Sequence, residues 1–521
     1  MRSQVLSPLP ATFPRLVLQA AREFGDAPAL IEESGEIWSY RRLEAEVRRA
    51  ARAFLAAGLQ IGDSAAIWSS NSAEWIVAAL GLQMAGGVLV PLNTRFKGQE
   101  AAYQIAASGA RILIAAGDFL GLDYLTLLDG IDIPGLAHRV SVPRGSGMSW
   151  QDFLALGDAV PADAVDRRLA QVTPDHVCDM LFTSGTTGRP KGVLTTHGQN
   201  LRQYDVYGRS IGIRRGDRYL IVNPFFHSFG YKAGWLAAFL QGAVALPHAV
   251  FDAETVLRRI EAERITVMPG PPALFQSLLA ADYRARDISS LRLATTGSAS
   301  VPVELVHRMK NDLGIDVVLT AYGLTESSGV VTISSPDDDF ETIAKTAGRA
   351  IEGIEMKIVD RDGATLPAGQ EGELLVRGYC VMKGYHNAPQ ATAEAIDAEG
   401  WLHTGDVSAI DARGILRITG RLKDMFIVGG FNCYPAEIEN ILLTHPEIAD
   451  AAVIGVPDER LGEVAKAFLV RRPGSDLTAP SVVEWSRANM ANYKVPRQVE
   501  FREALPKNAA NKVEKFKLRA E

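Results

Sequence analysis

"LFTSGTTGRPKGVL" (residues 181–194) joins an apolar segment to a run of small and hydroxyl-bearing residues that ends in a lysine. Small residues let the backbone approach a polyphosphate closely, while hydroxyls and amide N–H groups donate to its oxygens. Lys191 adds a mobile positive charge for the outer phosphates. The Walker pattern GxxxxGK[ST] is absent from the sequence. A plain surface turn rarely takes this form after a buried strand, so the stretch predicts a polyphosphate-binding loop.

Helix-like and strand-like segments alternate on both sides of this loop. A helical pattern over 40–59 precedes a strand at 64–70. Beyond the loop the predicted helices are 199–211, 253–263, 271–281 and 302–313, and the strands between them are 218–224, 265–270, 291–297 and 317–323. This alternation predicts an α/β fold with mostly parallel sheets covered by helices, whose ligands gather at the carboxyl ends of the strands.

The sequence pattern changes from about residue 350, where short alternating strands joined by glycine-containing turns predict a small β unit. After "RLKDMFIVGG" a further segment of strands and helices runs to the end of the chain, as a small α+β domain. We therefore predict a domain boundary near 421–424, which separates an N-terminal domain over 1–421 from a C-terminal domain over 425–521.

Composition excludes several classes of protein. The 521 residues carry a formal net charge of -7, which gives no general attraction to nucleic acid. The three cysteines have no metal-type spacing and fit a reducing compartment, and no secretion signal is apparent, so we expect a cytoplasmic protein. The apolar stretch 75–92 is interrupted by Gly86-Gly87, which predicts a buried helix feeding a buried strand and no membrane span.

Six motifs occur in the order found in one enzyme superfamily. They are "TSGTTGRPKG" (183–192), "YGLTE" (322–326), "GWLHTGD" (400–406), "GRLKD" (420–424), "GGFNCYPAEIE" (429–439) and "LPKNAANKV" (505–513). Together they resemble the adenylate-forming superfamily, which includes acyl-CoA synthetases, luciferases and the adenylation domains of peptide synthetases. The resemblance covers essentially the whole chain. It implies ATP, Mg²⁺ and coenzyme A as cofactors and cosubstrates, a carboxylic acid as substrate and a mobile C-terminal domain, and a homodimer is one compatible assembly.

The resemblance also implies an ATP and AMP site. Its residues are Thr183, Ser184, Gly185, Thr186, Thr187, Gly188, Lys191, Ser298, Tyr322, Gly323, Thr325, Asp406 and Arg421. Within this set, Tyr322 would stack on the purine, and Asp406 and Arg421 would contact the ribose. Glu326 would hold Mg²⁺ through oxygen, as this hard cation prefers.

Lys512 resembles the lysine that assists the first half-reaction, where an ammonium bridging two anions lowers the barrier. Asn511 stands where the superfamily usually has glycine. Lys423 resembles the hinge about which the C-terminal domain rotates between two steps. After that rotation Gly429, Gly430 and Phe431 would line a coenzyme A tunnel.

The acyl pocket is expected from "NPFFHSFGYKAG" (223–234) and from glycines further on. The predicted lining is Phe226, His227, Gly230, Gly297 and Gly323, with His227 as a catalytic gate beside the carboxylate. No acidic residue lies between 218 and 251, which disfavours a free amino acid as substrate. The amino-acid sequences of these segments resemble those of bacterial acyl-CoA synthetases that activate steroid-ring propanoates. Straight fatty acids and other alicyclic or aromatic acids are the competing substrates.

Four alternatives stay open at this point. "GRSIG" (208–212) fits the G-x-S-x-G pattern of serine hydrolases, but Ser210 lies in a predicted helix where that pattern requires a strand before the serine. A nucleotide-binding module without turnover is a second possibility. A ligase that loads a carrier protein in place of coenzyme A is the third, and an oxidative luciferase-like activity is the fourth.

Overall fold

The computed structural model describes residues 5–161, 163–183, 190–297, 301–428, 431–458, 460–508 and 512–519. The chain divides into two compact units. The first contains Met1–Glu355 and Val376–Leu402, and the second contains Met356–Leu375 and His403–Glu521.

A nine-stranded sheet, counted over the described residues, forms one half of the first unit. In spatial order its strands are β16 (Arg349–Ala350), β15 (Thr332–Ile333), β14 (Val317–Tyr322), β13 (Leu293–Gly297), β12 (Val267–Pro269), β10 (Arg218–Ile221), β11 (Val244–Pro247), β1 (Pro28–Ile31) and β2 (Ile37–Ser39). The six strands from β14 to β1 are parallel, and the outer strands pair in the antiparallel sense. The carboxyl ends of β10, β12, β13 and β14 therefore meet at one edge of this sheet.

A second sheet contains the strands that flank the predicted phosphate loop. In spatial order it has β19 (Gly384–Tyr385), β9 (Lys191–Thr196), β8 (Val177–Thr183), β4 (Val88–Pro91), β3 (Ser64–Trp68), β5 (Ile112–Ala116), β6 (His138–Val142) and β7 (Met148–Ser149). From β8 to β7 the pairs are parallel, whereas β8 with β9 and β9 with β19 are antiparallel. The antiparallel β8–β9 pair is thus a hairpin added to a parallel sheet.

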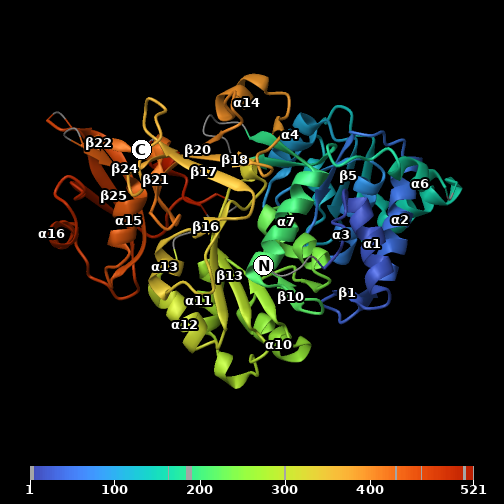
Figure 1. The fold of residues 1–521 in the computed structure, drawn as a ribbon, viewed down its shortest axis with the longest axis horizontal. Helices are drawn as coiled ribbons and strands as arrows, with labels where there is room; N and C mark the ends of the chain where they lie inside the picture. Colours follow the sequence, from blue (N-terminus) through green and yellow to red (C-terminus); the bar gives the residue numbers. More distant parts are fainter. Residues whose placement is uncertain are drawn as a thin grey trace. The chain divides into compact units, whose positions relative to one another are not determined.

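Helices cover both sheets (Figure 1). The helices of the first unit are α1 (Phe13–Phe24), α2 (Tyr40–Ala56), α3 (Ala73–Met84), α4 (Gly98–Ser108), α5 (Trp150–Leu156), α6 (Ala164–Leu169), α7 (His197–Ile211), α8 (Ser228–Gly230), α9 (Ala237–Leu240), α10 (Ala253–Glu263), α11 (Pro272–Ala280), α12 (Val303–Asn311), α13 (Phe340–Lys345) and α14 (Pro389–Ala395). Apolar faces of α10, α11 and α12 pack on the nine-stranded sheet through Leu257, Phe275 and Val306. Burial of such side chains from water is the main favourable contribution to folding of this layer.

Two smaller sheets consist mostly of residues of the second unit. One contains β17 (Ile354–Val359), β18 (Gly372–Gly378), β20 (Leu402–Ile410) and β21 (Leu416–Arg421), and the other contains β23 (Phe431–Cys433), β22 (Phe426–Val428), β25 (Gly462–Arg471), β24 (Ile448–Asp458) and β26 (Gln498–Arg502). The helices of this unit are α15 (Pro435–Leu442), α16 (Ala479–Asn489) and α17 (Lys515–Arg519). Leu469 on β25, Ile438 on α15 and Val482 on α16 share one core cluster.

The α/β fold class predicted from the sequence is confirmed, with parallel sheets in the first unit and a mixed α+β second unit. The predicted helix 253–263 has the bounds of α10, and the predicted strand 317–323 differs from β14 by one residue. The stretch 75–92 forms most of α3 and the whole of β4, both buried. Among the described residues no helix is long and apolar enough to cross a membrane.

Candidate active site

The β8–β9 hairpin brackets the predicted phosphate loop. Thr183 at the end of β8 pairs with Lys191 at the start of β9, and both side chains are half-buried. Ser184, Gly185, Thr186, Thr187 and Gly188 lie outside the described residues. The strands before and after the loop are therefore in register, with Lys191 at the base of the loop.

Glu326 lies in a single helical turn (Thr325–Ser327) shortly after β14. Tyr322, the last residue of β14, is half-buried and pairs with Thr332 of β15. Thr325 accepts a hydrogen bond from the Ser328 N–H at 3.0 Å through its carbonyl oxygen, which closes the turn. Three predicted nucleotide contacts therefore lie within a few residues of one strand end.

One tyrosine contacts both the phosphate-loop lysine and the predicted magnesium ligand. The hydroxyl of Tyr385 on β19 donates to Oε1 of Glu326 at 2.9 Å. The Nζ atom of Lys191 lies 5.0 Å from the centroid of the same ring. Burial, followed by the Glu326 carboxylate, raises the pKa of Tyr385 above its usual range, so its hydroxyl keeps its proton and acts as a donor.

Helix α7 links this turn to the hairpin, because α7 begins directly after β9. Gln203 donates to the Ser327 carbonyl oxygen at 3.0 Å, and the Tyr204 hydroxyl donates to that of Ser328 at 2.9 Å. Both α7 side chains are buried. The Glu326 turn is therefore fixed by buried hydrogen bonds to a helix that continues from the phosphate-loop strand.

The predicted acyl segment follows β10 at the same sheet edge. Phe226 is half-buried, and His227 is exposed at the N-cap of α8, where its Nδ1 accepts the Phe229 N–H at 3.2 Å. A ring whose Nδ1 accepts can present an Nε2–H outward. His227 is thus positioned by a local turn with its ring accessible to solvent.

Asn71 holds the start of this segment and was not identified from the sequence. Its amide nitrogen donates to the carbonyl oxygens of Ile221 at 3.1 Å, Asn223 at 3.0 Å and His248 at 3.1 Å. Its amide oxygen accepts from the Phe225 N–H at 2.8 Å. Because the side chain is buried, these bonds fix the backbone just before Phe226 and His227.

The glycines predicted to widen the acyl pocket have a packing role in this structure. A Cβ at Gly230 would lie 2.2 Å from the Asn223 carbonyl oxygen, one at Gly297 would lie 2.7 Å from that of Ala321, and one at Gly323 would lie 2.3 Å from that of Gly329. Each position therefore requires glycine for close backbone approach. Their place in an acyl pocket stays a prediction, and Ser298 lies outside the described residues.

The second unit brings together the two predicted ribose contacts. Asp406 on β20 pairs in register with Arg421 on β21, and the Arg421 Nε lies 2.9 Å from Oδ1 of Asp406. The Asp406 side chain is only 3% exposed, whereas that of Arg421 is 46% exposed. The pair is oriented by strand register, which is a stable way to present a carboxylate and a guanidinium together.

Lys423 lies in a short 3₁₀ turn (Leu422–Asp424) between β21 and β22. Partial desolvation, followed by the neighbouring Arg421 cation, lowers the pKa of Lys423. Gly429 and Gly430 lie outside the described residues, and Phe431 begins β23. The predicted hinge therefore falls at a turn that joins the two sheets of the second unit.

Lys512 is exposed near the C-terminus and is the first described residue after 508. Its N–H donates to Oδ1 of Asn508 at 3.0 Å, and its carbonyl oxygen accepts the Asn508 N–H at 2.8 Å. Asn511 lies outside the described residues. The backbone of Lys512 is therefore fixed by Asn508, while its side chain reaches the surface.

Residues 17–386 match the AMP-binding enzyme family, and residues 437–512 match the AMP-binding enzyme C-terminal domain. The chain belongs to the AMP-binding enzyme family. The adenylate-forming resemblance seen in the motifs is thereby confirmed, and this AMP-binding enzyme is a ligase of the acyl-CoA synthetase type.

Its curated relatives include two proteins named 3-[(3aS,4S,7aS)-7a-methyl-1,5-dioxo-octahydro-1H-inden-4-yl]propanoyl:CoA ligase. The one from Mycobacterium tuberculosis (strain ATCC 25618 / H37Rv) is 50% identical, with 99% of both chains covered. The one from Rhodococcus jostii (strain RHA1) is 46% identical, covering 98% of this chain and 99% of the relative. Among solved structures, the anthranilate CoA ligase AuaEII in complex with anthranoyl-AMP aligns with a TM-score of 0.87 at 28% identity, covering 98% of this chain and 97% of that one.

The serine-hydrolase alternative is not supported in this AMP-binding enzyme. Ser210 lies within α7, one residue before the helix ends, and no strand leads into it. A nucleophile elbow needs a strand immediately before the serine. The match of "GRSIG" to that pattern is therefore a coincidence of spacing.

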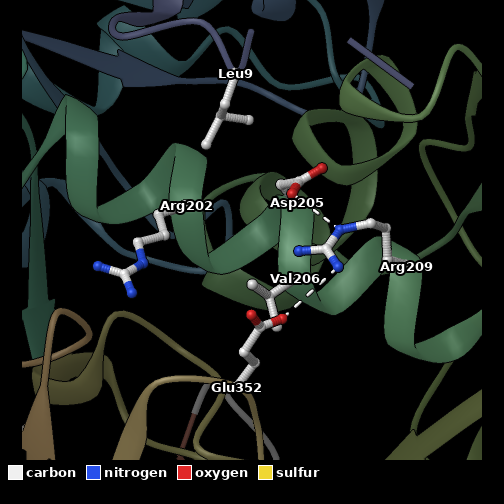
Figure 2. A pocket seen from close by; sticks show the side chains of 6 residues that line it. All are labelled: Leu9, Arg202, Asp205, Val206, Arg209 and Glu352. Atoms are coloured by element: carbon white, nitrogen blue, oxygen red, sulfur yellow. Dashed lines mark hydrogen bonds and ion pairs between the residues drawn. The ribbon is translucent and has the colours of Figure 1, made fainter. Parts of the chain in front are cut away.

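A cavity of about 200 Å³ lies beside α7 in the first unit (Figure 2). It is lined by Leu9, Arg202, Asp205, Val206, Arg209 and Glu352. Arg209 forms ion pairs with Asp205 at 3.0 Å and with Glu352 at 3.7 Å. Both acidic residues of the cavity therefore already pair with an arginine. None of the predicted site residues is among its lining residues, so the cavity is distinct from the candidate active site of the AMP-binding enzyme.

Proposed function

We propose that this AMP-binding enzyme is an ATP- and Mg²⁺-dependent acid:CoA ligase that works in two steps. A carboxylate oxygen of the acid attacks the α-phosphorus of ATP, the bond to the β-phosphate oxygen breaks, and pyrophosphate leaves. The coenzyme A sulfur then attacks the acyl carbon, its proton passes to solvent, and AMP leaves. The observation that carries this proposal is the meeting of Lys191 and Glu326 at Tyr385, beside the predicted phosphate loop.

The described residues fit Mg²⁺ at Glu326. A half-buried carboxylate with one oxygen held by the Tyr385 hydroxyl is a hard, oriented ligand. Over the described chain there is no group of three or more His, Cys, Asp or Glu residues that could hold a metal ion. One protein carboxylate with substrate phosphates and water is the usual way in which proteins hold Mg²⁺ with a nucleotide. When bound, the ion would draw negative charge from the phosphate oxygens.

Lys512 is the proposed electrostatic catalyst of the first step. Attack of a carboxylate on a phosphate brings two anions together, and an ammonium between them stabilises the charge that develops in the transition state. We propose that the domain over 425–521 adopts two orientations about the hinge at 422–424. Before the rotation, Lys512 serves the first step. After the rotation, the segment of Gly429, Gly430 and Phe431 serves thioester formation.

The proposed substrate is a bulky alicyclic acid of the ring-bearing propanoate type. Support comes from the two relatives of that name, which are similar over nearly the whole chain. The absence of any acidic residue between 218 and 251 argues against a substrate with a free ammonium group. Fatty acids are the second candidate class.

The test is a pyrophosphate-release assay with ATP, Mg²⁺ and coenzyme A over three acid classes: bicyclic ring-bearing propanoates, fatty acids and aryl acids. We expect the first class to give the highest kcat/KM, with AMP and an acyl-CoA thioester formed in equal amounts. If none of the acids led to ATP consumption, the proposal would be contradicted. A preference for fatty or aryl acids would contradict only the proposed substrate.

A carrier-protein ligase is the alternative acceptor class. Replacing coenzyme A with a phosphopantetheinyl carrier protein in the same assay separates the two, because only the true acceptor supports rapid AMP release. The cytoplasm is the proposed compartment, since Cys178, Cys380 and Cys433 are all free thiols. The homodimer stays a prediction that sedimentation equilibrium tests.

A further inference from the structure

The position of Tyr385 is fixed by the strand that returns from the phosphate loop. Tyr385 pairs with Val193 of β9, and the His386 N–H donates to the Gly192 carbonyl oxygen at 2.7 Å. Lys191 is the first residue of β9. The two residues that follow it, Gly192 and Val193, are therefore the ones that pair with the backbone around Tyr385. The position of the ring is therefore fixed relative to the phosphate-loop strand.

The Glu326 turn is fixed to the same segment from the other side. The Met382 N–H donates to the Glu326 carbonyl oxygen at 2.8 Å, and the Ser328 hydroxyl donates to the Cys380 carbonyl oxygen at 2.8 Å. Residues 380–386 thus lie between the lysine of one sheet and the carboxylate that follows a strand of the other sheet. Within this segment, the Tyr385 side chain is the group that contacts both charges.

We propose that Tyr385 is a positioning residue that sets the separation and orientation of Lys191 and Glu326 for the polyphosphate and its magnesium ion. The proposal rests on the proposed function, because it takes these two side chains as the phosphate and metal contacts. Two different forces are involved. A hydrogen bond from a neutral phenol orients the Glu326 carboxylate, and the face of the ring attracts the Lys191 ammonium.

Lys191 and Glu326 carry opposite charges, and both contact Tyr385. Because opposite charges attract, we expect that without this tyrosine they would favour a direct ion pair, which would take both side chains away from the ligand. The phenol contacts each charge as a neutral group: its hydroxyl donates to Glu326 at 2.9 Å, and the Lys191 Nζ lies 5.0 Å from its ring centroid. The site is therefore held open with one cation and one anion available to a polyanion and a divalent ion.

Tyr379 is a matched control in the same unit. Its ring lies under the Arg202 guanidinium at 4.1 Å, and its hydroxyl donates to the Glu352 carbonyl oxygen at 2.9 Å. Like Tyr385 it is half-buried with a cation over its ring and a donated hydrogen bond. It contacts none of the described residues that are assigned to the active site.

The experiment measures equilibrium binding of α,β-methylene-ATP, which cannot release pyrophosphate, as Mg²⁺ is varied. Tyr385→Phe loses only the hydrogen bond. We expect it to raise the Mg²⁺ concentration for half-maximal binding about tenfold, the lower range for loss of a group that orients a metal ligand. Tyr385→Leu also loses the ring, and we expect about twofold to fivefold weaker binding even in EDTA, as is typical of a lost cation–π contact. Tyr379→Phe and Tyr379→Leu should leave both quantities unchanged.

The outcomes separate this proposal from the proposed function. If Glu326→Gln changes the Mg²⁺ dependence and Tyr385→Phe does not, Glu326 keeps its role and the positioning role of Tyr385 is overturned. If Glu326→Gln has no effect, the metal role fails and the Tyr385 proposal fails with it. Equal effects of the Tyr385 and Tyr379 variants would show a general loss of stability and would also overturn it. If the wild-type enzyme does not bind the nucleotide, the proposed function itself fails.

Discussion

The ammonium of Lys232 lies 3.1 Å from Oδ1 of Asp179, and neither side chain is more than 1% exposed. Asp179 is on β8, which leads into the phosphate loop, and Lys232 lies within the predicted acyl segment. Thr195 and Asn200 complete the network, with the Lys232 Nζ donating to the Thr195 hydroxyl at 2.9 Å and the Asn200 amide donating to Oδ2 of Asp179 at 3.2 Å. A buried ion pair with these hydrogen bonds ties the phosphate side of the site to the acid side.

Removing one partner of the Asp179–Lys232 pair should lower the free energy of unfolding more than replacing both partners together. Asp179→Asn or Lys232→Met alone leaves one charge buried without its partner, and each should lower the free energy of unfolding by about 3–5 kcal/mol. The double variant should cost clearly less than the sum of the two, because no uncompensated charge remains. Urea denaturation of the four proteins in a double-mutant cycle measures this coupling. Additive effects would show that the pair does not act as a unit.

The sequence predicted the elements and the contiguous motifs well because both are local in the chain. Helix α10 follows from the spacing of Val256, Leu257 and Ile260, which all face the core. Asp406 and Arg421 were each recognised inside a short motif, and the structure places them side by side.

The residues that were missed act through partners far away in the sequence. Tyr385 contacts Glu326 across 59 positions, Asn71 contacts Phe225 across 154, and Lys232 contacts Asp179 across 53. A single sequence carries no periodicity or motif for such pairs, since they are brought together by packing of separate elements. Lys232 was visible in the acyl segment, but its burial could not be inferred from a stretch that also contains exposed His227.

Asn71 should control binding of the acid more than binding of ATP. Asn71→Ala removes four buried hydrogen bonds to the backbone around residues 221–225 and 248, which frees the segment that carries Phe226 and His227. We expect KM for the acid to rise by about tenfold, corresponding to about 1.4 kcal/mol, with a much smaller change in KM for ATP. Steady-state kinetics with each substrate varied in turn measures the two constants.

Asn71→Asp is the companion variant, because it keeps the oxygen that accepts from Phe225 and loses the three donated bonds. Its second carboxylate oxygen would face three carbonyl oxygens in a buried site, so it should raise KM for the acid at least as much as Asn71→Ala. Equal rises in both KM values for Asn71→Ala would instead indicate a general disturbance of the first unit, and the specific role of Asn71 in the acid segment would be wrong.

Glu32 should make stability depend on pH. Burial is the main cause that raises its pKa to about 7, with Glu74 and Glu33 adding to the effect and the Ala73 N–H and Arg259 opposing it. The folded state therefore binds more protons than the unfolded state between pH 4.5 and 7, and stability falls as pH rises through this window. The loss should reach about 3 kcal/mol, because each unit of pKa corresponds to ~1.4 kcal/mol.

Glu32→Gln keeps an oxygen for the Ala73 N–H and removes the titration. Its thermal midpoint should exceed that of the wild type at pH 8, and the difference should shrink toward pH 4.5. Differential scanning calorimetry across that range gives both curves. Parallel curves for the two proteins would show that Glu32 does not titrate in this window.

Lys512 should matter for one half-reaction and not for the other. Lys512→Ala removes the ammonium that is proposed to lie between carboxylate and α-phosphate, so adenylation should slow by about 10²–10³-fold, as for removal of other transition-state charge contacts. Thioester formation from supplied acyl-adenylate should change little, because no phosphate anion is being attacked. Rapid-quench measurement of each step separates them. Lys507→Ala is the matched control in the same sequence motif, where the Lys507 Nζ pairs with Asp450 at 2.7 Å, and it should leave both rates near those of the wild type. If Lys512→Ala slowed both steps equally, the lysine would act on folding or domain position and the proposed electrostatic role would be wrong.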